Sequence, residues 1–488
     1  MSRPRKPHDP ATWPIPCGRC GEHRQHVAAW PDAHVCGYCY QEAKRTRGTC
    51  RCGHTGVLPG RIDQKPSCRA CSGVRLNVDC RTCGAEDELY TGTQCWSCVL
   101  AATVDRLLTN PHTGVMTDAL VPIAQALKTM TRANSGLTWL RQPHVATFIQ
   151  QLAREAAITH ASIDTLPSSR TREYVRALLV EHGAVPRRDD LAARFAVWAD
   201  TALGRVNDPQ SRDMMRRYIR WHHQRRMNGM PAVTQGTFLC AKQNVTAAIE
   251  LTNWLHHHQL TFDELNQSHL DAWQASGPST REHASSLLRW AQQARLADPQ
   301  LQLTAHQRGN SHTLSSNEQH TAVQRLIKQP TLPARDRLAA ILVLVFGQQI
   351  DNVVRLTWDH VDVTDELVTI RLGAAEIALP HPLDEPIREL AADRGQHRTA
   401  AHPETNWVFR GYNPGQHIHP GHLRTRLRRE FSARAARLGT LHELTRLAPV
   451  PIIAEALGYS PKTIERHAVA SATTYSQYIA AVRAGRQG

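Results

Sequence analysis

Between about residues 110 and 330, apolar residues recur at helical spacing, with few strand-like runs. Residues 243–260 place Val245, Ala248, Ile249 and Leu255 on one face. Residues 279–296 carry a second such stripe, formed by Ala284, Leu287, Leu288 and Ala291. Capping-box patterns predict helix starts at 261–264, 268–271 and 279–282. We therefore expect a helical bundle in the middle of the chain.

The pattern changes at residues 366–380, "ELVTIRLGAAEIALP". Two runs rich in β-branched and apolar residues flank a possible turn at 373–375, which predicts a β-hairpin. Together with the helical stretches, this predicts a mainly α fold with a small β-sheet, of the α+β class.

A chain of 488 residues is too long for one core, so two to four domains are expected. Its formal charge of +15 and its pI near 9.5 favour a polyanionic partner such as nucleic acid, although a solvated basic surface would give the same values. No run of about 18 apolar residues predicts a membrane span. The opening residues "MSRPRKPHDP" lack the apolar core of a signal peptide, so we expect a cytoplasmic, nucleoid-associated protein.

All cysteines except Cys240 lie before residue 99, and they form closely spaced pairs. Taken in order, the pairs make three groups of four cysteines, which recur about every 30 residues. In each group the first pair is followed by glycine, as in "CGRCG". Paired thiolates with a following glycine are typical of zinc ribbons, so we expect three Zn²⁺ ions, whose binding supplies folding energy. The expected ligands are Cys17, Cys20, Cys36 and Cys39; Cys50, Cys52, Cys68 and Cys71; and Cys80, Cys83, Cys95 and Cys98.

The second group is irregular, because one residue separates Cys50 from Cys52, and His54 is an alternative ligand. Redox-active cysteines and iron–sulfur ligation are rival interpretations of all three groups. The pattern does not distinguish ribbons that contact DNA from ribbons that contact protein.

An arginine-rich stretch lies at residues 211–229, beside Trp221. Guanidinium groups on a shared helical face bind phosphates well, but a solvated helix face would look similar. The DNA-binding candidates here are Arg212, Arg216, Arg217 and Arg220.

Residues 347–358, "GQQIDNVVRLTW", resemble a motif of the tyrosine recombinases, the phage integrase family. The resemblance extends over roughly residues 200–480. It includes a core-binding-like bundle before residue 302, a strand at "WVFRG" (407–411), a helix leading to the His-x-x-Arg motif, and the segments "LGYS" and "KTIERHA". It implies a DNA clamp, with further DNA contacts from Arg424, Arg428, Arg429, Arg434 and Arg437.

The resulting domain organisation begins with three Cys₄ ribbon modules and ends with a recombinase-like catalytic domain. The expected ranges are 1–105 for the ribbons, 106–200 for a helical region, 201–302 for the core-binding-like domain, 303–330 for a linker and 331–488 for the catalytic-like domain.

The resemblance also implies which residues should perform the chemistry, and most of these positions are altered. The first arginine position holds Gln349, and no lysine occurs between Lys328 and Lys462, so the hairpin turn has none. His442 matches the family histidine, while Thr445 occupies the second arginine position and Arg446 follows it. Tyr459 stands at the next His/Trp position, and His467 stands where the nucleophilic tyrosine is expected.

Three functions follow from this sequence. The favoured one is a non-catalytic protein that binds double-stranded DNA, together with itself or other recombinases, as an accessory or regulatory factor. The second is an active recombinase in which Tyr478 or Tyr475 is the nucleophile and Arg446 acts in catalysis. The third is a protein-docking hub built on the zinc ribbons.

Overall fold

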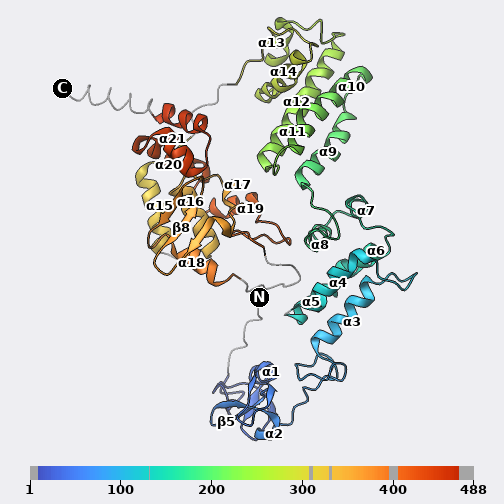
Figure 1. The fold of residues 1–488 in the computed structure, drawn as a ribbon, viewed down its shortest axis with the longest axis vertical. Helices are drawn as coiled ribbons and strands as arrows, with labels where there is room; N and C mark the ends of the chain where they lie inside the picture. The colour runs from blue at the N-terminus through green and yellow to red at the C-terminus, as the bar shows by residue number, and fades with distance from the viewer. Residues whose placement is uncertain (1–8, 131, 307–311, 329–331, 395–404, 472–488) are drawn as a thin grey trace, which may run out of the picture. The chain divides into compact units, whose positions relative to one another are not determined.

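The computed structural model describes residues 9–130, 132–306, 312–328, 332–394 and 405–471 (Figure 1). The chain divides into two compact units, the first built mainly on Met1–Val185 and the second mainly on the residues from Pro186 onward. Within the described residues, no helix is both long enough and apolar enough to cross a lipid bilayer. Each unit has its own cores and is described by itself.

The first unit begins with three small modules rich in cysteine. Each of the first two modules pairs short antiparallel strands and then enters a helix. Apolar residues from two modules share a core, in which Val57, Val74 and Val78 pack with Trp30 and Tyr40. The elements are β1 (His26–Ala29), β2 (His34–Cys36), α1 (Gly37–Arg45), β3 (Arg47–Thr49), β4 (Thr55–Val57), β5 (Gly60–Ile62), β6 (Lys65–Ser67) and α2 (Arg69–Ser72).

A helical core follows in the same unit. Its first helix, α3 (Trp96–Leu108), starts inside the third module and buries Leu100, Val104 and Leu107 against the helices that follow. This helix therefore joins the last cysteine group to a conventional apolar core. The other elements are η1 (Asp118–Leu120), α4 (Val121–Lys128), α5 (Ala133–Leu140), α6 (Pro143–Ala153), α7 (His160–Thr165) and α8 (Arg170–Glu181).

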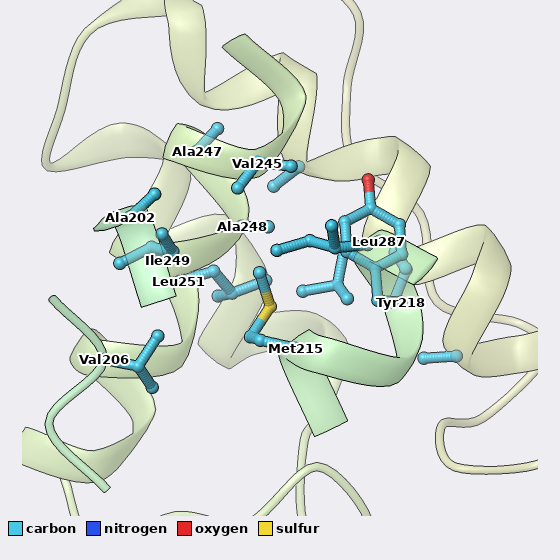
Figure 2. Packing of buried hydrophobic residues seen from close by; sticks show 14 of the residues in the cluster. Ala202, Val206, Met215, Tyr218, Val245, Ala247, Ala248, Ile249, Leu251 and Leu287 are labelled. Carbon is cyan, nitrogen blue, oxygen red and sulfur yellow. The ribbon is translucent and has the colours of Figure 1, made fainter. Parts of the chain in front are cut away.

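The second unit opens with a helical bundle around the long helix α12 (Gln235–His257). Figure 2 shows Met215 and Tyr218 on one side of this core, with Leu287 close to Tyr218. Both apolar stripes predicted from the sequence are buried here, as expected. The surrounding elements are α9 (Asp190–Leu203), α10 (Pro209–Tyr218), the π-helix η2 (Ile219–Gln224), α11 (Arg225–Asn228), α13 (Gln267–Ala275), the 3₁₀-helix η3 (Ser279–Ala284) and α14 (Ser285–Gln293).

The predicted helix starts in this bundle are wrong in detail. Glu264 does accept from the backbone N–H of Thr261, at 2.9 Å, but this contact closes a turn and no helix follows it. Helix α13 begins earlier than predicted, because Asn266 caps it by accepting from the backbone N–H of His269. The third start is a 3₁₀-helix preceded by Pro278. At the second and third places, a residue other than the predicted cap therefore precedes the helix.

The rest of the second unit combines helices with one three-stranded sheet, in the order β7–β8–β9. The predicted hairpin is confirmed: β8 (Val368–Arg371) and β9 (Glu376–Leu379) are antiparallel, with Arg371 opposite Glu376. The expected strand at 407–411 is wrong, since Trp407 and Arg410 form only isolated bridges. The other elements are α15 (Ser316–Lys328), α16 (Ala334–Leu344), α17 (Ile350–Val353), η4 (Trp358–His360), β7 (Val361–Val363), α18 (Glu385–Ala392), α19 (Pro420–Leu427), α20 (Ala433–Leu447) and α21 (Val450–Leu457).

Helix α15 lies in the segment that we expected to be a linker. Its Ala322 and Leu326 join the core of the recombinase-like part, and Gln319 donates to the carbonyl of Ala436 in α20 at 3.2 Å. The predicted domain boundaries stay predictions. The fold class is confirmed: the described chain is mostly helical, with small sheets and N-terminal cysteine clusters.

Candidate functional sites

Three groups of four cysteines bring their sulfur atoms together. Within each group all four Sγ atoms lie within 4.8 Å of one another, and the groups are those predicted: Cys17, Cys20, Cys36 and Cys39; Cys50, Cys52, Cys68 and Cys71; and Cys80, Cys83, Cys95 and Cys98. Four sulfurs around a tetrahedral zinc, each about 2.3 Å from the metal, lie about 3.8 Å apart. One sulfur pair in each group matches this value, at 3.8 Å for Cys20–Cys36, 3.6 Å for Cys52–Cys68 and 3.7 Å for Cys80–Cys98.

Local backbone geometry explains why these residues converge. The glycine after each first pair has a positive φ, +72° at Gly21, +86° at Gly53 and +73° at Gly84, which residues with a Cβ rarely adopt. The third cysteine of each group is the N-cap residue of a helix, α1, α2 or α3, and the fourth lies in the first turn. The positive end of each helix dipole therefore faces thiolate ligands.

Backbone N–H groups also stabilise the thiolates. The N–H groups of Cys36, Cys68 and Cys95 each point at the sulfur of the first cysteine in their group, at 3.3 Å. The N–H groups of Cys68 and Cys52 lower the pKa of Cys50 to about 6. Because zinc binds deprotonated thiolates, this arrangement fits three zinc sites.

His54, the alternative ligand, has another partner. Its Nε2 lies 3.0 Å from Oε2 of Glu86, which also accepts from the backbone N–H of Val57 and pairs with Arg69 at 2.6 Å. Glu86 belongs to the third module and its partners belong to the second. These contacts join the two modules into one body.

The recombinase-like site is built around the turn between α16 and α17. Gly347 has a φ of +59°, and a Cβ there would lie 3.0 Å from the Leu441 side chain, so the turn packs directly on α20. Gln348 is buried and donates to the carbonyl of Leu457 at 2.9 Å. Gln349 is the N-cap residue of α17 and is exposed, so its neutral side chain faces solvent beside this turn.

Tyr459 is joined to this turn by a hydrogen bond. Its hydroxyl donates to the carbonyl of Gly347 at 2.6 Å, and Nε of Arg437 donates to the same hydroxyl at 3.1 Å. Burial raises the pKa of Tyr459, although the nearby Arg437 opposes this shift. Arg437 was predicted as a DNA contact, and it lies half-buried beside Tyr459, within this site.

Two histidine rings, those of His442 and His467, lie next to each other near Arg437. The ring centroids of His442 and His467 are 5.7 Å apart. Burial, together with Arg437, His442 and Arg466, lowers the pKa of His467 to about 4. Burial and Arg446 also lower the pKa of His442, so both rings are neutral near pH 7.

Thr445, at the second arginine position, and Arg446, the residue after it, each contact a neighbour in the same helix. The Thr445 hydroxyl donates to the carbonyl of His442 at 2.9 Å. Arg446 is exposed and pairs with Glu443 at 3.1 Å. Tyr475 and Tyr478 lie outside the described residues.

The hairpin turn without lysine is packed against α21. The N–H of Ala374 donates to the carbonyl of Glu455 at 2.9 Å. A Cβ at Gly373 would come within 1.9 Å of the same carbonyl oxygen. The turn residues are therefore small because they lie directly on the helix end, a contact that the sequence pattern did not reveal.

The predicted DNA-binding arginines differ in their surroundings. Arg216, Arg217, Arg220, Arg424, Arg428, Arg429 and Arg434 are exposed. Arg216 pairs with Asp213, and Arg424 pairs with Asp351 at 3.1 Å. Arg212 is half-buried and donates to the carbonyl of Val206 at 2.7 Å, so it holds the start of α10.

A family model matches part of the chain, and several solved structures are similar to it. Residues 313–445 match the model of the phage integrase family. Among solved structures, the chain is similar to the XerH site-specific recombinase bound to palindromic difH substrate in a post-cleavage complex, with 12% identity and a TM-score of 0.39, over 60% of this chain and 97% of that chain. It is also similar to a lambda integrase dimer bound to a COC′ core site (14% identity, TM-score 0.34, 61% of this chain and 85% of that chain) and to the integrase from mycobacterium phage Brujita (16%, 0.23, 53% and 91%). No curated protein matches the chain.

Proposed function

We propose that this chain, in which residues 313–445 match the phage integrase family, binds double-stranded DNA and does not cleave it. The family match, the formal charge of +15 and the exposed arginines of α10, α19 and their flanks support DNA binding. The neutral groups at the positions of the catalytic residues support the loss of cleavage.

Strand cleavage in this family places demanding requirements on one site. A tyrosine hydroxyl attacks the phosphate, and the pentavalent transition state gathers negative charge that arginines stabilise. A general acid then protonates the leaving 5′ oxygen. Loss of one such electrostatic contact costs about 3 kcal/mol in the transition state, so the joint loss of charge, acid and nucleophile removes the reaction.

The observation that carries the proposal is the state of the turn at Gly347. Gln349 presents a neutral amide where the resemblance implies a guanidinium, and an amide cannot form the charged bidentate fork. Arg437, which reaches this turn through Tyr459, donates its Nε to the Tyr459 hydroxyl. His467, at the nucleophile position, has an imidazole ring next to His442.

An active recombinase is the alternative, and one observation favours it. Arg437 and His442 keep a guanidinium and an imidazole around the turn, so two polar groups suited to phosphate remain. In that case Tyr478 or Tyr475 would be the nucleophile and Arg446 the second arginine. Arg446 is now paired with Glu443 and would have to leave that partner.

The cysteine modules are proposed to hold three Zn²⁺ ions and to add a second contact, either to DNA or to protein. If the modules act only as a protein-docking hub, a chain lacking residues 1–100 would keep its DNA affinity but no longer bind its protein partner. If they contact DNA, the shortened chain would bind DNA more weakly. Measuring duplex affinity with and without this segment separates the two.

The experiment that tests DNA binding is selection from random duplexes. The protein should enrich a defined set of sequences from the pool, as expected for a nucleoid-associated regulator acting with itself or with other recombinases. Failure to enrich any sequence, together with no measurable duplex affinity at low salt, would contradict the proposal. The enriched duplexes then serve as substrates for a cleavage assay.

A further inference from the structure

The segment α10–η2–α11 buries every fourth residue. Met215, Ile219, His223 and Met227 are between 0% and 5% exposed. In a regular α-helix four residues advance 400°, so this spacing would rotate away from the core by about 40° at each step. The π-helix η2 has a wider turn and takes up this rotation. All four residues therefore stay in the core, and the opposite side of the segment stays continuously exposed.

Buried hydrogen bonds hold the π-helix in place. Nε2 of His223 lies 2.9 Å from the hydroxyl of Tyr218, which in turn contacts the hydroxyl of Ser286 in η3–α14. Tyr218 is fully buried, and Figure 2 shows it beside Leu287. Since π-turns weaken a helix and often mark functional positions, a network that keeps one in place indicates that the outward surface has a use.

That outward surface is the Trp221 surface, which we define by its exposed residues. Its members are Arg216, Arg217, Arg220, Trp221, Arg225 and Arg226. Trp221 is 56% exposed, and the guanidinium carbon of Arg225 lies 5.4 Å from the centre of its ring. A large ring held over water by a neighbouring cation is available to stack on a second flat group.

The charge around the ring identifies the class of partner. Arg216 pairs with Asp213, while Arg226 and Arg289 of α14 act on the neighbouring His222, lowering its pKa beyond the effect of burial. The cations extend from α10 across to α14. Five arginines clustered around one exposed tryptophan match the negative backbone and the flat bases of a nucleic acid.

We propose that the Trp221 surface is a nucleotide-stacking site, at which Trp221 stacks on an unpaired or unstacked base and the flanking arginines bind the adjacent phosphates. This inference rests on the proposed DNA binding and adds a preference that a duplex clamp alone would not have. Phosphate binding needs only the arginines, whereas an exposed indole gains most from a base that has left its stack.

The test compares two DNA molecules of the same sequence, a perfect duplex and a duplex with one unpaired nucleotide. The full chain should bind the second molecule roughly five- to a hundredfold more tightly, the range expected for one stacked base. Trp221→Ala should remove this preference and leave perfect-duplex affinity almost unchanged, and Trp221→Phe should keep most of it. Val121, an exposed apolar residue of α4 outside the elements proposed to bind DNA, provides the control Val121→Ala, which should behave as wild type.

Three results would overturn the inference. Equal affinity of the wild type for both molecules would do so, as would an unchanged preference in Trp221→Ala. If Trp221→Ala instead abolishes self-association in sedimentation without DNA and leaves both affinities unchanged, the surface is a protein interface. Absence of binding to either molecule would contradict the proposed function itself, which is a distinct failure.

Discussion

The cysteine modules and the recombinase-like site differ in whether the residues expected to perform their chemistry are present. In the modules every expected ligand is present and in place, even where the spacing of Cys50 and Cys52 is irregular. In the recombinase-like site the turn, the hairpin and the helices are present, while Gln349 and His467 stand where the resemblance implies an arginine and a tyrosine.

The difference reflects what holds each region together. The small modules have few apolar residues, so a metal held by their sulfurs would supply most of the folding energy. The recombinase-like part has a full apolar core, and its site residues lie at the edge of that core. A fold of the second kind survives the loss of its catalytic groups, whereas a fold of the first kind does not survive the loss of its ligands.

Metal removal should therefore have the largest effect, and it should affect one region only. Structural zinc contributes about 10 kcal/mol or more per site, so a strong chelator should unfold the cysteine modules. Elemental analysis of the reduced protein should give a ratio of zinc to protein near three, and circular dichroism should show the helical bundle around α12 intact after chelation.

Cys80→Ser should lower the ratio by one, and Cys240→Ser, at an exposed position outside the groups, should not change it. A ratio near zero with folded modules would refute the zinc assignment. A ratio near two would indicate that the irregular group, which contains Cys50 and Cys52, does not bind zinc.

Replacing Arg216, Arg217 and Arg220 together with alanine should have the next largest effect. Each lost phosphate contact reduces the slope of log affinity against log salt by about 0.9, so the slope should fall by up to about three. Filter binding or fluorescence anisotropy over a salt series measures this. Arg212→Ala is the matched comparison from the same helix: it should lower stability, because Arg212 holds the Val206 carbonyl, with little change in slope. An unchanged slope in the triple variant would show that the face is merely solvated.

The half-buried His467 should give the recombinase-like part a pH dependence of intermediate size. The pKa of folded His467 is lowered to about 4, chiefly by burial, so the unfolded chain takes up a proton first as the pH falls. The free energy of unfolding of this part should therefore decrease from about pH 6.5 downward, toward about pH 4. His467→Gln should weaken this dependence when denaturation is followed at about pH 7 and about pH 5. The exposed His306→Gln is the control, and equal dependence in wild type and His467→Gln would show that the ring is not buried in solution.

The smallest effect is expected from restoring one catalytic group. Gln349→Arg adds a cation at an exposed N-cap, so DNA affinity should rise slightly through one more phosphate contact. Cleavage should not appear, since the acid and the nucleophile are still missing. Cleavage by this single variant would show that the rest of the site is competent and that only the first arginine is lost.

The sequence predicted well where one period or one ligand type determines the structure. The stripes at Val245 and Leu287 are buried, and the twelve ligands group as expected, because helical spacing and thiol pairing are local properties. Helix starts were predicted less well, since Asn266 and Pro278 compete with the capping patterns next to them. The strand expected at 407–411 is reduced to isolated bridges, because strand pairing depends on distant partners.

Contacts between segments far apart in the chain were beyond the sequence pattern. Arg437 was predicted on a DNA-facing surface, yet its Nε contacts Tyr459, 22 residues further along. The same holds for the turn at Gly373, whose small residues are explained by the end of α21. The π-helix around Trp221 depends on a hydrogen bond between the hydroxyls of Tyr218 and Ser286, which are 68 residues apart.

Trapping a covalent protein–DNA adduct tests the central claim most directly, namely that a recombinase frame persists here without strand cleavage. Nicked suicide duplexes of the selected sequence let the leaving strand diffuse away, so any phosphotyrosine intermediate accumulates and is detected on a denaturing gel. The account predicts no adduct with the wild-type protein on any enriched sequence. An adduct that disappears in Tyr478→Phe or in Tyr475→Phe would contradict it and would establish an active recombinase with a displaced nucleophile.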